Sequence, residues 1–195
     1  MRYLPILLAA ALSGCATSTT PVSTPAAAAG PYRDTIALAG RFSATYPKDG
    51  QPQNIVVKYT WRQQPGRIDV AIASPLDQTL ATISVTPQAA TLTEAGKPPR
   101  VAKDIDTLTA QTLGWSLPVG GLRDWLQGYA TDANGKRFAA SPANNSVVTN
   151  DGWRLRFVAW QEGTATPLPR RIDAERSATP TSDELALRIL IDPAG

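Results

Sequence analysis

The sequence contains no histidine, and its single cysteine is Cys15. The missing histidine removes the usual general base, the Ser/His/Asp and Cys/His triads and the commonest zinc ligand. One cysteine can form neither an intramolecular disulfide nor a cysteine cluster for a metal. We therefore expect no metal site, no cofactor and no histidine-dependent enzyme.

Charge is also sparse, and no apolar run is long enough to span a bilayer. The chain carries 19 Lys and Arg against 16 Asp and Glu, a formal net charge of +3 over 195 residues. No basic run is interleaved with aromatic residues, the pattern typical of nucleic-acid binding. This composition indicates a partner other than nucleic acid.

The N-terminus has the pattern of an export signal. Arg2 precedes a short apolar stretch, residues 4–12, which is too short to span a bilayer as a stable helix. The stretch ends in Leu12-Ser13-Gly14-Cys15, which resembles the lipobox of bacterial lipoproteins. This resemblance implies cleavage after residue 14 and lipidation of the Cys15 thiol. The alternative, an ordinary buried cysteine, gives no reason for its place directly behind an export signal.

Residues 15–30 are expected to form the lipidated cysteine and a flexible tether. They are small, polar or proline-rich and cannot bury enough apolar surface to fold. Their r.m.s. reach is about 20 Å. In Gram-negative lipoproteins an aspartate after the cysteine commonly marks retention at the inner membrane, whereas this chain has Ala16. The resemblance thus implies an outer-membrane protein, held by its lipid anchor and facing the periplasm.

Residues 31–195 are expected to fold as one mainly β domain. Seventeen prolines and fourteen glycines break the chain into short segments. Apolar and polar residues alternate with a period of two, which is typical of antiparallel strands covered on one face. The predicted strands are 36–46, 54–62, 67–72, 81–86, 153–157 and 185–192.

Two short helices are expected to interrupt the strands. Residues 104–113 carry apolar residues on one helical face, with Asp104 or Asp106 as the N-cap and Gly114 as the stop. Residues 120–128 place apolar side chains at i, i+3 and i+4, and Gly128 ends the pattern. Both helices are expected to cover one face or mouth of the sheet.

The run from Leu113 to Gly128 resembles a motif of the outer-membrane lipoprotein receptor family LolB. The family pattern is G-x-x-L-P-[LV]-x-x-L-x-x-W-[LI]-x-G, and this chain reads LGWSLPVGGLRDWLQG. Gly40-Arg41-Phe42 and Ser74-Pro75-Leu76 also resemble family segments and come in the right order. The resemblance implies an incomplete antiparallel β-barrel, or half-barrel, whose short helices form a lid over an apolar concave face.

The resemblance also implies a function and partners. Such a receptor is expected, as a monomer, to accept acylated lipoprotein cargo from a LolA-like periplasmic carrier and insert it into the outer membrane. Water exposure of acyl chains costs about 0.8 kcal/mol per CH₂ group, so the chains need a shield. An apolar concave face can provide one.

The candidate acyl-cavity and lid residues are apolar strand positions and apolar or aromatic lid positions. For each of them the alternative is an ordinary packed core residue, and sequence cannot separate a filled interior from a hollow one. The candidates are Ile68, Val70, Ile72, Ile83, Val85, Trp115, Leu122, Trp125, Trp153, Leu155 and Phe157.

Three further candidate residues lie outside this set. Pro75 and Leu76 lie between two predicted strands, and the resemblance implies a hairpin tip that inserts Leu76 into the membrane; an isolated exposed leucine is the alternative. Arg41 is a candidate for hydrogen bonds to lid backbone or lipid carbonyls, with a solvated strand arginine as the alternative.

Two other functions stay open. A lipid-anchored structural or envelope-assembly factor would bind another protein through a sheet edge or the lid and would have a filled core. A Ser/Lys or two-carboxylate hydrolase would use groups such as Asp104, Asp106 and Asp124, although helix caps and solvated helix faces explain these residues more simply.

Overall fold

The computed structural model describes residues 29–113, 115, 117–162, 168–180 and 183–193. The predicted signal peptide (1–14), the lipidation site Cys15 and the tether as far as residue 28 lie outside the described residues. So does Gly114, the predicted end of the first helix.

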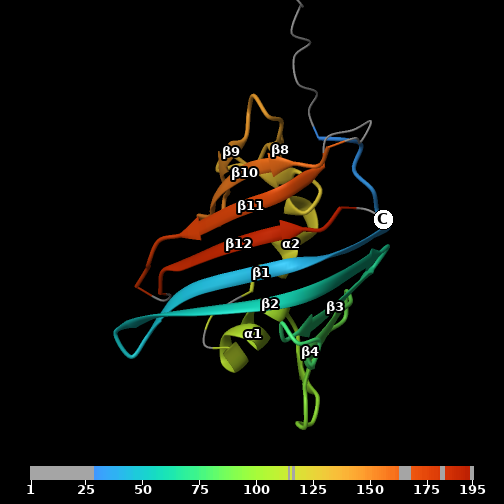
Figure 1. Ribbon diagram of the computed structural model, residues 1–195, viewed down its shortest axis with the longest axis vertical. Helices are drawn as coiled ribbons and strands as arrows, with labels where there is room; N and C mark the ends of the chain where they lie inside the picture. Colours follow the sequence, from blue (N-terminus) through green and yellow to red (C-terminus); the bar gives the residue numbers. More distant parts are fainter. Residues whose placement is uncertain (1–28, 114, 116, 163–167, 181–182, 194–195) are drawn as a thin grey trace, which may run out of the picture.

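Ten strands form one open antiparallel sheet (Figure 1), in the order β6-β5-β4-β3-β2-β1-β12-β11-β10-β9. The edge strands β6 and β9 do not pair with each other, so the barrel is not closed. The strands are β1 (Ile36–Lys48), β2 (Gln51–Gln64), β3 (Arg67–Ala73), β4 (Thr79–Val85), β5 (Ala90–Glu94), β6 (Arg100–Ala102), β9 (Ser146–Val148), β10 (Arg154–Trp160), β11 (Pro169–Arg176) and β12 (Leu185–Ile191).

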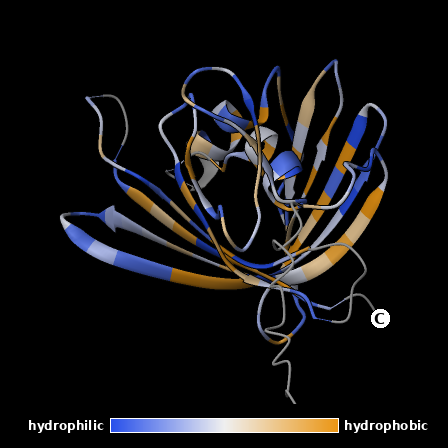
Figure 2. Ribbon diagram, turned by 90° about the horizontal axis from the view of Figure 1, so that it is seen from above, coloured by the Kyte–Doolittle hydropathy of each residue, from blue (hydrophilic) through white to orange (hydrophobic). Residues whose placement is uncertain are grey.

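Two short helices and a small hairpin complete the described fold. Seen from above, the sheet curves into a trough, and the helices lie within the curve (Figure 2). Helix α1 (Ile105–Leu113) packs against β5 and β6, while α2 (Val119–Trp125) packs against the hairpin of β7 (Tyr129–Thr131) and β8 (Arg137–Ala139). The predicted mainly β half-barrel with helices over its concave face is confirmed.

The period-two pattern sets which face of each strand looks into the trough. On β12, Leu185, Leu187 and Ile189 are buried, whereas Ala186 and Arg188 between them are exposed. Neighbouring strands keep the same phase, so that apolar residues from different strands meet on the concave side. Each fully buried aliphatic side chain contributes about 1.5–3 kcal/mol, which makes this face the main source of stability.

The helix boundaries follow from local hydrogen bonds. Asp104 is the N-cap of α1, because its Oδ1 accepts the N–H of Thr107 at 2.8 Å. Helix α2 is shorter than predicted and ends at Trp125. Gly128 lies beyond it, with φ of +83°, and its N–H donates to the Trp125 carbonyl at 2.9 Å. Gly128 therefore forms part of the turn that follows the helix and is not its last residue.

The period-two pattern did not predict several of the strands. The clearest is β11, because charged residues dominate its sequence and hide its two inward side chains, Ile172 and Ala174. Its outward Asp173 forms ion pairs with Arg171 at 2.8 Å and Arg188 at 3.3 Å. Strands β5, β6 and β9 and the β7–β8 hairpin were also not predicted; four of these five strands have only three residues.

Strand β1 joins the two halves of the sheet, since it pairs with β2 on one side and β12 on the other. Gly40 allows this close approach. A Cβ atom placed there would lie 1.9 Å from the Leu190 carbonyl oxygen and 3.1 Å from Cε1 of Tyr59. Backbone cannot yield as a flexible side chain does, so only glycine fits.

We predict that Gly40→Ala destabilises the protein by about 2–3 kcal/mol or more, because the added methyl group separates β1 from β12. Urea denaturation measures the change. The matched control is Gly120→Ala, because a Cβ atom at Gly120 in α2 meets nothing within 4 Å. Alanine there is expected to be neutral or to stabilise by up to about 1 kcal/mol. Equal stability of both variants would refute the close approach.

Candidate functional site

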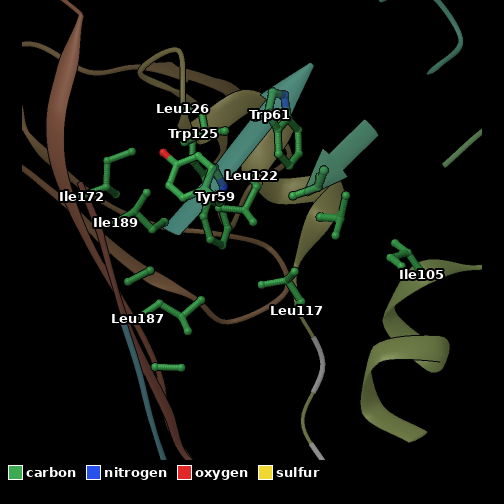
Figure 3. Close-up of a cluster of buried hydrophobic side chains, with 14 of the residues drawn as sticks. Tyr59, Trp61, Ile105, Leu117, Leu122, Trp125, Leu126, Ile172, Leu187 and Ile189 are labelled. Carbon is green, nitrogen blue, oxygen red and sulfur yellow. The ribbon is translucent and has the colours of Figure 1, made fainter. Parts of the chain in front are cut away.

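A small apolar cavity lies between the concave face and the helical segment above it (Figure 3). Its volume is about 30 Å³, roughly the share of one water molecule in the liquid. Ligand pockets usually measure about 300–1,000 Å³, so the interior is almost filled. The lining residues are Phe42, Tyr59, Trp61, Val70, Ile72, Leu117, Leu122, Leu126 and Ile189.

The covering segment, called the lid below, comprises Trp115, Leu117, Pro118, α2 and Leu126. Its own side chains are what fill the trough. Trp115 is 8% exposed, and its ring centroid lies 6.1 Å from that of Phe42 and 6.0 Å from that of Tyr46. Because lid and wall meet through apolar groups, the contact is held by burial rather than by directional bonds.

One buried hydroxyl joins α1 to the lid. Thr109 Oγ1 is fully buried; it accepts the N–H of Leu117 at 2.9 Å and lies 3.0 Å from the Ile105 carbonyl oxygen, to which it donates. The Leu117 N–H, itself in a buried residue, thus has its hydrogen bond. The lid position therefore depends on α1 as well as on the sheet.

The other end of the lid packs against aromatic residues near β10. The indole of Trp125 meets that of Trp153 edge to face at 5.5 Å. Gly121 makes room for it, since a Cβ atom there would lie 2.6 Å from Cζ2 of Trp125. Phe157, which is fully buried, stacks on Phe138 at 6.3 Å.

The predicted cavity residues are distributed unevenly around the cavity. Val70, Ile72 and Leu122 line it. The others belong to the surrounding buried cluster: Ile68, Ile83, Val85, Trp115, Trp125, Trp153, Leu155 and Phe157. Their contact with any acyl chain stays a prediction.

Six lining residues were not among the candidates: Phe42, Tyr59, Trp61, Leu117, Leu126 and Ile189. A sequence signal for most of them existed. Tyr59 and Trp61 alternate along β2 as Ile189 does along β12, and Leu117 and Leu126 lie in the lid motif.

Arg41 does not belong to the apolar face. It is exposed on β1, between the inward positions Gly40 and Phe42, and lies opposite Lys58 and Leu190 in the neighbouring strands. Strand alternation therefore points its side chain to the convex side, away from the lid. This position favours the alternative of a solvated strand arginine over a contact with the lid, while a contact of Arg41 with lipid carbonyls stays a prediction.

The loop between β3 and β4 presents an exposed leucine on an ordered tip. Leu76 is 84% exposed. Ser74 Oγ accepts the N–H groups of Leu76 and Gln78, both at 3.2 Å. Asp77 has a φ of +63°, and its two carboxylate oxygens accept hydrogen bonds from Lys58 Nζ at 2.7 and 2.8 Å. Pro75, also exposed, restricts the tip further.

The sequence matches the family described as Outer membrane lipoprotein LolB over residues 34–193, which include the sheet and both helices. The chain belongs to the LolB family. It is 40% identical over 160 residues to the outer-membrane lipoprotein LolB of Cupriavidus taiwanensis, covering 79% of this chain and 78% of that protein. The LolB of Thiobacillus denitrificans is 31% identical over 195 residues, covering 98% and 97%.

A solved structure supports the fold separately. The LolA superfamily protein from Nitrosomonas europaea superposes with a TM-score of 0.52 at 10% identity, covering 85% of this chain and 86% of that one. The resemblance found in the sequence is thus confirmed, as is the predicted outer-membrane lipoprotein. LolB is a lipoprotein-localisation family and not an enzyme family.

Local contacts shift the pKa of Tyr59 in β2 and the pKa values of Asp104 and Asp106 at the start of α1. Burial raises the pKa of the Tyr59 hydroxyl, and the nearby Asp192 raises it further. The Thr107 backbone N–H lowers the pKa of Asp104, whose carboxylate serves the α1 cap. Partial burial and the neighbouring Asp104 and Asp151 raise the pKa of Asp106.

The described part of the chain holds no group of three metal-ligating side chains. No helix within it is long and apolar enough to cross a membrane.

We predict that Thr109→Val in this protein lowers the free energy of unfolding by about 1–3 kcal/mol, because the buried Leu117 N–H loses its acceptor. Urea denaturation measures the loss. Thr60→Val is the matched control, since Thr60 is exposed on β2; its expected effect is within about 0.5 kcal/mol. A loss no larger than that of the control would show that Thr109 does not hold the lid.

Proposed function

We propose that this chain is an outer-membrane-anchored receptor that accepts lipoproteins from a LolA-like periplasmic carrier. It shields their acyl chains against the concave face and inserts them into the outer membrane. The observation that carries this proposal is an apolar concave face covered by a lid of apolar side chains, in a family of lipoprotein localisation. Such a face suits a cargo whose acyl chains must not meet water.

Cargo entry requires the lid to move away from the sheet. The space of about 30 Å³ is far below the pocket sizes that hold ligands, and two or three acyl chains need the volume that Leu117, Leu122 and Leu126 now occupy. Exchange of lid for cargo replaces one apolar covering by another. The concave face stays buried during the exchange. The stabilisation of about 25 cal/mol per Å² of buried apolar surface is therefore kept, and it does not oppose the exchange.

The size of α2 suits such an exchange. It has seven residues, and isolated helices shorter than about 12 residues are marginal in water. Its stability therefore comes from packing on the sheet and on the β7–β8 hairpin. Loss of this packing frees the lid without unfolding the ten-stranded sheet.

The hand-off is proposed to follow descending free energy, because the periplasm is expected to lack ATP. The receptor binds the acyl chains more tightly than the carrier does, and the bilayer binds them more tightly still. Mixing carrier-bound lipoprotein with an excess of this protein is expected to transfer the cargo without nucleotide. Cargo that stays on the carrier under these conditions contradicts the proposal.

An envelope-assembly factor is the second candidate, and the filled interior favours it. Uptake of an apolar fluorescent dye by the full chain separates the two functions. A lid that exchanges for acyl chains predicts saturable uptake that added lipoprotein displaces. An interior that never opens predicts no uptake and would support the assembly factor.

Leu76 is proposed to enter the membrane while cargo is released. We predict that Leu76→Glu folds and accepts cargo normally but inserts it into vesicles at least about tenfold more slowly, because a charged tip resists entry into apolar lipid. Val101→Glu is the control, since Val101 is 67% exposed on β6, away from the tip. Equal insertion rates for the two variants would remove Leu76 from the mechanism.

A further inference from the structure

The first described residues lie against the β7–β8 hairpin. The Ala29 N–H donates to the Ala140 carbonyl at 2.7 Å, and the Tyr129 hydroxyl donates to the Gly30 carbonyl. The last two residues of the predicted tether, 29 and 30, are therefore hydrogen-bonded to the folded body. Residues 29–33, called the clasp below, belong to the folded body.

Gln127 connects the clasp to the lid. It follows α2 by two residues and is 3% exposed. Its Oε1 accepts the N–H of Arg33 at 2.9 Å, and its Nε2 donates to the carbonyl of Arg33 at 3.0 Å. Both ends of the buried amide are thus satisfied by one residue of the clasp. This paired bond fixes direction as well as distance, which apolar packing does not.

Tyr32 connects the clasp to α2 and to the cavity wall. Its hydroxyl accepts Nε of Arg123 in α2 at 3.0 Å and Nε2 of Gln63 in β2 at 3.1 Å. Gln63 is 1% exposed, and its Oε1 accepts Nε1 of Trp61 at 3.4 Å. Trp61 lines the cavity. A chain of hydrogen bonds therefore runs from the cavity wall through the clasp to the lid.

Aromatic stacking fixes the clasp on the hairpin that supports α2. The rings of Tyr32 and Tyr129 meet edge to face at 5.7 Å. The guanidinium of Arg137 in β8 lies 4.9 Å from the first ring centroid and 4.4 Å from the second. The hydroxyl bonds of Tyr32 can therefore be removed while its ring stays in place.

We propose that Tyr32 and Gln127 are positioning residues that hold the lid closed by bonding it to the clasp. Release of the clasp then accompanies lid opening, and an occupant that displaces Trp61 acts on the same bonds. The role rests on the proposed function in one respect, namely that the lid opens to admit acyl chains. The clasp itself rests on the contacts above.

Gln127→Leu in the full lipid-anchored chain tests the proposal. Loss of two hydrogen bonds of ordinary net strength changes an equilibrium by about tenfold. Hydrogen exchange at the Leu122 and Leu126 amides is therefore expected to accelerate about tenfold, while the central sheet amides stay protected. Gln88→Leu, in the exposed turn between β4 and β5, is the matched control. Lid exchange equal to that of the control would overturn the proposal.

Tyr32→Phe provides the second variant and guards against a folding defect in the first. It keeps the ring stacked on Tyr129 and removes only the hydroxyl. Lid exchange and the apparent affinity for an apolar dye are both expected to rise several-fold while the central sheet amides stay protected, since a larger open fraction binds more tightly overall. A purely structural role predicts unchanged or weaker dye binding, and that outcome would also overturn the proposal.

The two readouts separate the two proposals. Hydrogen exchange at the lid needs no cargo and reports on the clasp alone. A lid that responds to Gln127→Leu in a protein that never takes cargo from the carrier would leave the clasp standing and remove the receptor function. Normal cargo transfer together with unchanged lid exchange in both variants would leave the receptor function standing and remove the clasp.

Discussion

The structure depends on the need to keep one apolar face out of water. A ten-stranded antiparallel sheet whose edges do not meet exposes its concave side unless something covers it. The lid provides this cover with leucine and tryptophan side chains, and the apolar cavity left between lid and wall measures about 30 Å³. Lid and wall bury each other's apolar surface, and under the proposed function this same mutual burial lets acyl chains replace the lid.

The apolar contact needs a rigid wall and a directional lock, and different residues supply them. The wall is continuous because β1 pairs along both sides, with Gly40 permitting the approach to β12. The lock is polar: the Thr109 hydroxyl holds Leu117, and the Gln127 amide holds Arg33. Burial supplies most of the free energy, whereas these few hydrogen bonds define where the lid rests.

Much of this arrangement was predictable from the sequence, for reasons visible at particular residues. The alternation of Leu185, Leu187 and Ile189 predicted an inward face, and the motif around Pro118 and Trp125 predicted the lid. A motif match does not give the phase of a side chain, so it did not show that Arg41 lies on the convex side, although its inward neighbour Phe42 does. Strand β11 was missed because its outward charges outnumber its inward apolar residues.

Neither the filled interior nor the clasp could be predicted from the sequence, and the reason is a different one. A period-two pattern says which way a side chain points but not how much volume lies in front of it. Gln127 and Arg33 are 94 positions apart, and neither belongs to a periodic pattern. A buried amide that bonds to distant backbone leaves no local signal. Polar locks of this kind become visible only in the folded chain.

The β3–β4 hairpin has a geometric consequence for the route of cargo. Val70 and Ile72 of β3 line the cavity, and Leu76 forms the tip of the loop that follows this strand. Leu76 lies four positions after Ile72, about 13 Å of extended chain at 3.3 Å per residue. If the tip enters lipid, the cavity wall and the bilayer lie closer together than the length of one acyl chain. Cargo could then have one end in the bilayer before the other end has left the protein.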